Sequence, residues 1–84
     1  MISPIIIDRY KQIIDKNLDG DLETDPYQKL SHLKWMLDEI VGNDAQSITK
    51  KHRWLGFIQG VLIAKKLTTV DRERDFTRDL FNGD

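Results

Sequence analysis

The sequence predicts an all-α fold, a small domain of four helices (three longer and one short) with a central antiparallel helical hairpin. Apolar residues recur at helical spacing in four segments, and no strand is predicted. A helix start signal, a capping residue followed by proline, occurs twice, at Ser3-Pro4 and at Asp25-Pro26. Because the chain has 84 residues, we expect a single domain over residues 1–84.

The first predicted helix begins at Pro4 and ends near Lys16. Ser3 is a good N-cap, and proline is favoured at the first helical position. At about 100° per residue the apolar side chains fall on one face, which we expect to be buried. These side chains are Ile6, Ile7, Tyr10, Ile13 and Ile14.

The second helix is predicted from Pro26 to about Val41, since Asp25 precedes the proline and Gln28 completes a capping box. Its expected core stripe consists of Leu30, Leu33, Leu37, Ile40 and Val41. Trp35 lies roughly 150° from the centre of that stripe. Two alternatives stay open for this residue: the first or fourth helix covers it, or it contacts a partner, as tryptophan often does at interfaces.

The third helix is predicted from about Ser47 to Lys66. Its apolar arc covers about 180° of the helix, and a helix apolar over so much of its circumference is normally central. We therefore expect it to be the spine of the domain, in an antiparallel hairpin with the second helix. The arc consists of Trp54, Leu55, Phe57, Ile58, Val61 and Leu62, extended by Ile63 and Ala64.

Small residues recur every four positions along the third helix, at Gly56, Gly60 and Ala64. Each glycine inside a helix costs about 1 kcal/mol relative to alanine, so the stripe calls for a compensating contact. Without side chains, another helix can approach closely. Two interpretations stay open: a crossing with the first or second helix of the same chain, or a self-complementary homodimer surface.

The fourth helix is predicted from Val70 to about Phe81, with Thr68 or Thr69 as its cap. Its apolar side chains form a narrow edge, which we expect to dock on the third helix. This edge consists of Val70, Thr77, Leu80 and Phe81.

Composition narrows the classes of function. The 13 basic and 14 acidic residues nearly cancel, which argues against a generic nucleic-acid binder. The absence of cysteine excludes disulfides and cysteine-ligated zinc. The apolar start, residues 1–7, is too short for a membrane span and lacks the basic region of a signal peptide, so we expect a cytoplasmic protein.

No pattern in the sequence indicates catalysis. The segment Asp15–Glu23 imitates the first positions of an EF-hand calcium loop, but Pro26 stands where the loop needs a bidentate glutamate. We therefore expect the segment Asp15–Glu23 to be a solvent-exposed acidic turn. Zinc-protease and phosphate-loop motifs are absent, so we predict no catalytic residues, no metal ligands, no cofactor and no enzymatic activity.

A basic run, Lys50-Lys51-His52-Arg53, opens the third helix. One interpretation is a solvated face. The other is a contact with phosphate, a nucleotide or an acidic partner, since arginine binds phosphate well. Some packings would bring the fourth helix's arginines nearby to complete an anion pocket. These are Arg72, Arg74 and Arg78.

Three segments carry a resemblance to small, mostly uncharacterised bacteriophage proteins. They are Arg53-Trp-Leu-Gly-Phe-Ile-Gln-Gly60, the segment Glu73-Arg-Asp-Phe-Thr-Arg78, and His32-Leu-Lys-Trp-Met36. The resemblance covers roughly residues 27 to 81, and Asp79 stands where that group has proline. It carries no catalytic motif. It implies a short early phage product that binds and redirects a host or defence protein.

These observations together predict a non-enzymatic protein-interaction module, a phage-encoded modulator or inhibitor of a host or defence protein in the host cytoplasm. The expected partner surface consists of His32, Trp35, Arg53, Arg74 and Arg78. One alternative is a small oligomeric protein that binds a nucleotide or another anion. A weaker alternative is a nucleic-acid-binding module using the basic start of the third helix.

Overall fold

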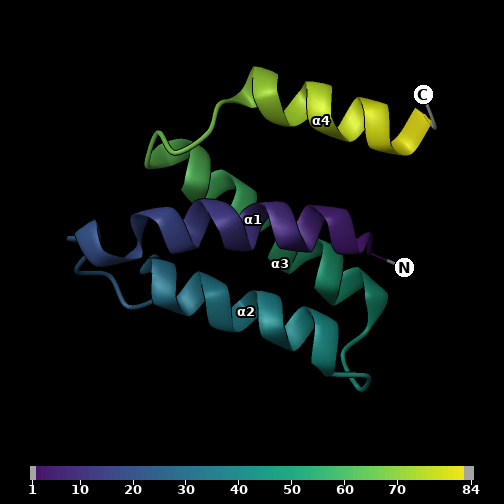
Figure 1. The fold of residues 1–84 in the computed structure, drawn as a ribbon. Helices are drawn as coiled ribbons and strands as arrows, with labels where there is room; N and C mark the ends of the chain where they lie inside the picture. The colour runs from purple at the N-terminus through teal and green to yellow at the C-terminus, as the bar shows by residue number, and fades with distance from the viewer. Residues whose placement is uncertain (1, 83–84) are drawn as a thin grey trace.

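The computed structural model describes the backbone of residues 2–82 and the side chains of residues 2–78. This part of the chain contains four α-helices and no strand, which confirms the all-α prediction. The antiparallel pairing of the second and third helices is visible in Figure 1. The helices are α1 (Pro4–Asn17), α2 (Leu30–Gly42), α3 (Ile48–Ala64) and α4 (Val70–Asn82), and a short 3-10 helix, η1 (Leu18–Gly20), follows α1.

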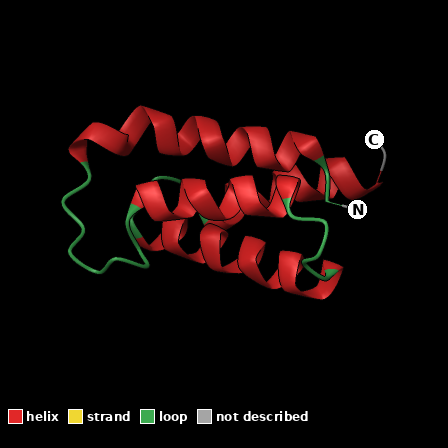
Figure 2. Ribbon diagram, turned by 90° about the horizontal axis from the view of Figure 1, so that it is seen from below, coloured by secondary structure: helices red, strands yellow, loops and turns green. Residues whose placement is uncertain are grey.

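Helix α1 has neighbours on three of its sides. In Figure 1, α1 lies between α2 and α4, with α3 behind it. Seen from below in Figure 2, α1, α2 and α3 are three adjacent rods, and α4 lies beyond them, on the side away from α2. The buried core is formed by Ile6, Ile7, Tyr10 and Ile14 of α1, Leu30, Leu33, Met36, Leu37 and Ile40 of α2, and Ile58, Val61 and Leu62 of α3.

Helix α1 forms as predicted. The Ser3 side chain caps it by accepting a hydrogen bond of 3.2 Å from the Ile5 amide, and Pro4 occupies the first turn. The predicted apolar face is buried, with Ile13 only partly covered. Local capping and apolar spacing therefore suffice to specify this helix.

Helix α2 begins at Leu30, four residues later than the predicted start at Pro26. Residues 26–28 form only an isolated turn, and Lys29 has an extended backbone. The cause is a carboxylate nine residues upstream: Asp21 accepts a hydrogen bond of 2.8 Å from the Leu30 amide. A cap supplied from outside the local sequence thus overrides the capping signal at Asp25.

The core stripe of α2 also differs at one position from the prediction. Val41 is exposed, and Met36 takes its place among the buried residues. The buried arc of α2 is turned toward Met36, which is 6% exposed, and away from Val41, which is 60% exposed. The predicted burial of Val41 is therefore wrong.

Helix α3 is not the spine of the domain. Ile58, Val61 and Leu62 are its buried residues, while Phe57 is 41% exposed. Because α1 and α2 both pack on the side that carries Ile58, the flanking residues Trp54, Leu55 and Ile63 are only partly buried. Helix α1, with neighbours on several sides, has the central position instead (Figure 1).

The stripe of small residues on α3 has no partner within the chain. Gly56, Gly60 and Ala64 are exposed. Apart from the backbone of α3, no atom lies within 4 Å of the place that a Cβ would occupy on either glycine. The predicted crossing with the first or second helix is therefore wrong, because those helices approach α3 from its other side. The homodimer alternative concerns a second chain and stays a prediction.

The end of α3 also comes earlier than predicted. The helix ends at Ala64 because Lys66 adopts a left-handed conformation, with φ of 63°. The Leu67 amide then donates a hydrogen bond of 3.0 Å to the Leu62 carbonyl. This pairing closes the helix end and turns Leu67 toward the core, where it is partly buried.

Helix α4 starts at Val70 as predicted, and Thr69 caps it by accepting a hydrogen bond of 3.2 Å from the Arg72 amide. The predicted apolar edge is wrong at Val70, which is exposed. Thr77 is partly buried, and the side chains of Leu80 and Phe81 lie outside the described residues. The most buried side chain on the described part of α4 is a charged one, Glu73.

Glu73 joins α4 to α1. Its side chain is only 3% exposed, and its Oε2 accepts hydrogen bonds of 2.7 Å from Arg9 and 2.6 Å from Thr68. Arg9 also lies over the Phe76 ring, 4.7 Å from its centroid. Tyr10 packs beside this carboxylate and accepts a hydrogen bond of 3.1 Å from Gln59 of α3. Among the described residues, the contact between α1 and α4 therefore combines this ion pair with Phe76, which is partly buried against the core.

The environment of Glu73 favours its ionised form. Burial raises the pKa of the Glu73 carboxyl, but hydrogen bonds from Arg9 and Thr68 outweigh that effect and hold the pKa below its usual value of 4.5. Burial and the nearby Glu73 charge raise the pKa of the Tyr10 phenol, which keeps its proton. The ion pair consequently stabilises the fold above about pH 4.5 and loses that effect as the pH falls through the lowered pKa.

Replacing Glu73 with glutamine should lower the free energy of unfolding at pH 7 by about 2–4 kcal/mol, because the change leaves Arg9 partly buried without its counter-charge. The deficit should shrink as the pH falls below about 4.5, where the wild-type carboxylate also takes up a proton. Urea unfolding at pH 7 and at acidic pH measures both effects. Asp75→Asn, at an exposed position of α4, is the control and should have little effect. Equal stabilities of wild type and Glu73→Gln at pH 7 would contradict the assignment.

Candidate functional site

An open groove lined mainly by aromatic side chains lies between α2 and α3. It has a volume of about 590 Å³. Three of its aromatic side chains are strongly exposed: Tyr27 (68%), Trp35 (49%) and Phe57 (41%). Contiguous exposed apolar surface of this kind marks interaction sites. The residues that line this aromatic groove are Tyr27, His32, Trp35, Met36, Arg53, Trp54 and Phe57.

Four rings of the aromatic groove form a continuous chain of contacts. The Tyr27 ring meets His32 edge to face at 5.6 Å between centroids, and His32 stacks on Trp35 at 5.4 Å. Trp35 in turn lies 5.8 Å from Trp54, which carries the chain from α2 to α3. These separations lie within the range of favourable aromatic pairs. The rings therefore hold one another in place, so little side-chain entropy remains to be lost on binding.

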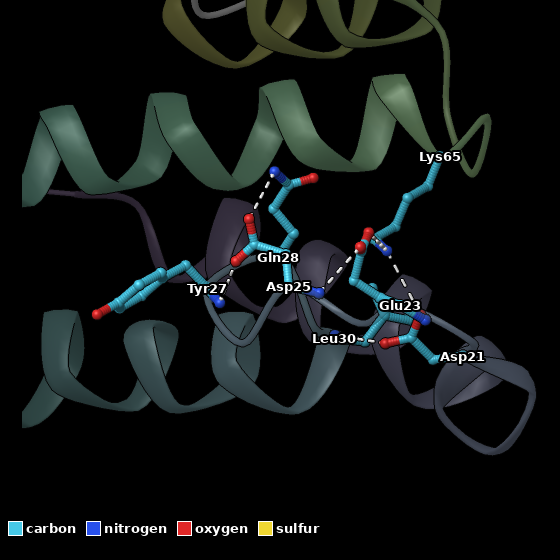
Figure 3. Close-up of polar contacts among 7 residues, drawn as sticks. All are labelled: Asp21, Glu23, Asp25, Tyr27, Gln28, Leu30 and Lys65. Carbon is cyan, nitrogen blue, oxygen red and sulfur yellow. Dashed lines mark hydrogen bonds and ion pairs between the residues drawn. The ribbon is translucent and has the colours of Figure 1, made fainter.

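The aromatic groove is basic at one end. At the beginning of α3, the Lys50 amine lies 5.2 Å from the centroid of the Trp54 ring, and Arg53 lines the groove. Toward the end of α3 lies the acidic loop, residues 21–29, which carries Asp21, Glu23 and Asp25 (Figure 3). Asp21 and Glu23 are paired with Lys65 and do not line the groove.

The acidic loop is fixed to both neighbouring helices. Asp21 caps the start of α2 through the Leu30 amide at 2.8 Å. The Lys65 amine at the end of α3 lies 2.9 Å from Glu23 and 3.4 Å from Asp21 (Figure 3). The Leu30 hydrogen bond lowers the pKa of Asp21, and the Lys65 contact lowers that of Glu23. Burial opposes the charge on Lys65, yet both carboxylates raise its pKa. All three groups are thus charged at neutral pH.

A second pair of hydrogen bonds places Tyr27 at the groove. The Asp25 carboxylate accepts a hydrogen bond of 2.9 Å from the Tyr27 amide and one of 3.3 Å from the Gln28 side chain. Figure 3 shows the Tyr27 side chain pointing along the space between α2 and α3, away from Lys65. The residues of the expected capping box therefore form a turn that presents an aromatic ring.

The acidic segment Asp15–Glu23 does not take the shape of a calcium loop. Asp15 lies within α1 and pairs with Lys34 of α2 at 2.7 Å. Residues Leu18–Gly20 form the 3-10 helix η1, and Asp21 and Glu23 bind Lys65. Among the described residues, no group of three or more acidic or histidine side chains is arranged to hold a metal ion.

Three of the five residues expected on a partner surface lie together in the aromatic groove: His32, Trp35 and Arg53. The proposed cover of Trp35 by the first or fourth helix is wrong, since Trp35 is half exposed and its aromatic contacts are His32 of α2 and Trp54 of α3. Arg74 and Arg78 belong to α4, on the side of the molecule away from α2 (Figures 1 and 2). The structure thus separates them from the surface around Trp35.

The expected anion pocket between Arg53 and the α4 arginines is not formed. Arg78 is exposed and lies 3.4 Å from Asp75 of its own helix. Arg72 and Arg74 are also exposed. Because α4 packs through Glu73, its arginines face solvent around that contact.

The remaining predicted residues border the groove. Arg53, Gly56, Phe57, Gly60 and Ala64 share one exposed side of α3, which we call the α3 strip. Arg53 and Phe57 belong to both the α3 strip and the aromatic groove. The two exposed surfaces are therefore continuous.

Sequence reasoning missed Tyr27, Met36, Trp54 and Phe57 as groove residues. Trp54 and Phe57 belonged to the arc of α3 assigned to the core. The width of that arc, about 180°, could have indicated that part of it stays exposed, because neighbours packed on one side of a helix cover only about 100° of its circumference. No pattern in the sequence indicated that Tyr27 lines the groove, since its position depends on Asp21, which caps α2 at the Leu30 amide.

Comparison of the chain with protein-family models, with curated proteins and with solved structures gave no match. Within the described residues, no helix has the length and apolar character needed to cross a membrane. Function is therefore argued from the aromatic groove and the surfaces next to it.

Replacing Asp21 with alanine should lower the free energy of unfolding by about 1–2 kcal/mol, because the change removes the cap of α2. The same change should loosen the loop that carries Tyr27, which would raise acrylamide quenching of tryptophan fluorescence in the groove. Asp19→Ala is a matched control, since Asp19 is exposed in the same segment. An Asp21→Ala variant as stable as the control would show that the loop is not fixed in this way.

Proposed function

We propose that the protein is a non-enzymatic protein-interaction module and that the aromatic groove is its contact surface. The proposal is carried by one observation, the row of mutually packed and exposed rings that runs from Tyr27 through Trp35 to Trp54. Tryptophan, tyrosine and arginine dominate the binding energy of protein interfaces, and all three line the groove.

The shape of the groove favours a polypeptide partner. It is open and shallow-sided rather than enclosed, and its lining is mostly apolar with Arg53 at the margin. Small-molecule sites usually enclose most of their ligand, whereas a protein surface can cover an open apolar face. The resemblance to bacteriophage proteins adds the expectation that the partner is a host or defence protein, which this chain would modulate or inhibit in the host cytoplasm.

Trp35→Ala should abolish partner capture while leaving the chain folded, because Trp35 is half exposed and lies outside the buried core. Immobilised wild type and variant are incubated with bacterial host lysate, and the retained proteins are identified by mass spectrometry. Leu22→Ala is the matched control, since Leu22 is an apolar residue that is 92% exposed and lies outside the groove. Equal retention by all three proteins would argue against the aromatic groove as the contact surface.

A second candidate function, the binding of a nucleotide, is favoured by the position of Lys50. Its amine lies 5.2 Å from the Trp54 ring centroid, and Arg53 stands in the same helix turn. Flat aromatic rings stack on bases, and lysine or arginine beside them can bind a phosphate. This alternative uses the same groove but only its basic end.

Tryptophan fluorescence distinguishes the two candidates, because both tryptophans of the chain, Trp35 and Trp54, lie in the groove. A nucleotide that stacks there should quench the emission with a saturable dependence on concentration, and Arg53→Ala should weaken its binding. Mononucleotides and cyclic dinucleotides form the panel. Labelled oligonucleotides, titrated at several salt concentrations, test the nucleic-acid alternative. Unchanged emission with the whole panel would eliminate nucleotide binding in the groove.

A further inference from the structure

The aromatic groove carries positive charge that the described part of the chain does not neutralise. Arg53 lines the groove, and the Lys50 amine lies 5.2 Å from the centroid of the Trp54 ring. Both side chains are exposed, and neither forms an ion pair with a described residue. The cations beyond the end of α3, Lys65 and Lys66, do not line the groove.

The carboxylates nearest to the groove have other partners. Glu39 of α2 accepts a hydrogen bond of 3.2 Å from the Asn43 side chain, and Asp25 accepts its hydrogen bonds within its own turn. The other two carboxylates of the acidic loop are paired with Lys65. None of these four groups lines the groove. A counter-charge for Lys50 and Arg53 therefore has to come from a bound molecule or from the solvent.

Each of the two cations precedes an aromatic ring of the groove by one helical turn. Lys50 stands four residues before Trp54 and Arg53 four residues before Phe57, which is about 6 Å along the helix. Residues at this spacing share one side of a helix. A molecule lying along this side of α3 thus meets aromatic surface and a positive charge about one turn apart. In a polypeptide, that spacing joins residues i and i+4 of a helix or i and i+2 of an extended segment.

The position of the charges favours an acidic polypeptide over a cation and over a nucleic acid. Aromatic faces can bind cations, but Lys50 already lies over Trp54, and Arg53 repels further positive charge. A single-stranded nucleic acid has a phosphate at every nucleotide and needs cations along its whole path. Here the charge lies at one end of the groove, and the rest of the lining is mainly aromatic.

We infer that the partner presents an acidic segment of polypeptide to the aromatic groove. An aromatic or long aliphatic side chain of that segment packs on Trp35 and Trp54. A carboxylate about one helical turn away from it pairs with Lys50 or Arg53. The apolar contact supplies most of the affinity, and the ion pair fixes the direction in which the segment lies. This inference rests on the proposed function, because it describes the partner of the same groove.

Selection of displayed random peptides on the immobilised full chain tests the inference without a known partner. Peptides that bind wild type but not Trp35→Ala should be enriched in aspartate and glutamate, about two to four residues from an aromatic residue or leucine. The double variant Lys50→Glu/Arg53→Glu should select lysine and arginine at those positions instead. It should bind the peptides selected on wild type about tenfold or more weakly, because like charges then face each other.

Arg72→Glu/Arg74→Glu is the matched control. Both arginines are exposed on α4 and lie outside the groove, and the change in net charge is the same. This variant should select acidic peptides and bind them as wild type does. Both double variants should keep the circular dichroism of wild type, since all four positions are exposed. Added salt should weaken peptide binding to wild type, because exposed charges are screened.

The outcomes separate this inference from the proposed function. Peptides that depend on Trp35 but are neutral or basic overturn the inference and leave the proposed function standing. Acidic peptides that bind Lys50→Glu/Arg53→Glu as tightly as wild type also overturn it, as does their displacement by a mononucleotide or oligonucleotide that binds more tightly. If no Trp35-dependent peptide is selected, the inference fails, and the lysate capture by wild type and Trp35→Ala alone decides the proposed function.

Discussion

The carboxylate of Asp21 is the constraint on which the arrangement of the groove depends. It caps α2 by accepting a hydrogen bond from the Leu30 amide, and it pairs with Lys65 just after the end of α3. One side chain therefore joins the beginning of α2 to the end of α3. With that start fixed, the antiparallel pairing of α2 and α3 brings Trp35 opposite Trp54. A start at Pro26 would place Tyr27 on a helix instead of on the loop that presents it.

A second constraint is the limited amount of chain available to cover α3. Domains of this size bury only about 60–65% of the surface of their unfolded chain, so some apolar surface stays outside. Exposed large apolar side chains occur at several separate places on this chain, among them Ile5, Leu22 and Val70, and also in the aromatic groove. Helices α1 and α2 cover the Ile58 side of α3, and α4 lies beyond α1. The aromatic groove is a place where several exposed rings lie in contact with one another.

The parts of the fold that follow from neighbouring residues could be predicted, and the parts that depend on distant contacts could not. The cap at Ser3 and the apolar face of α1 are local, so α1 was correct almost to the residue. The start of α2 depends on Asp21, which no local pattern reveals. In the candidate site, the helical spacing of apolar residues correctly predicted that Trp35 lies outside the core. Its contact with Trp54 could not be predicted, because that contact depends on how α2 and α3 are placed relative to each other.

The way α4 is attached gives a physical reason why the apolar face of α3 stays open. On the described part of α4, the side chains turned toward α1 are Glu73, which is buried, and Phe76, which is partly buried against the core. Placing an ionised carboxylate on an aromatic surface without a counter-charge is costly, whereas Arg9 of α1 satisfies it at 2.7 Å. Glu73 and Phe76 therefore attach α4 to Arg9 of α1. In this position α4 does not line the aromatic groove around Trp54 and Phe57.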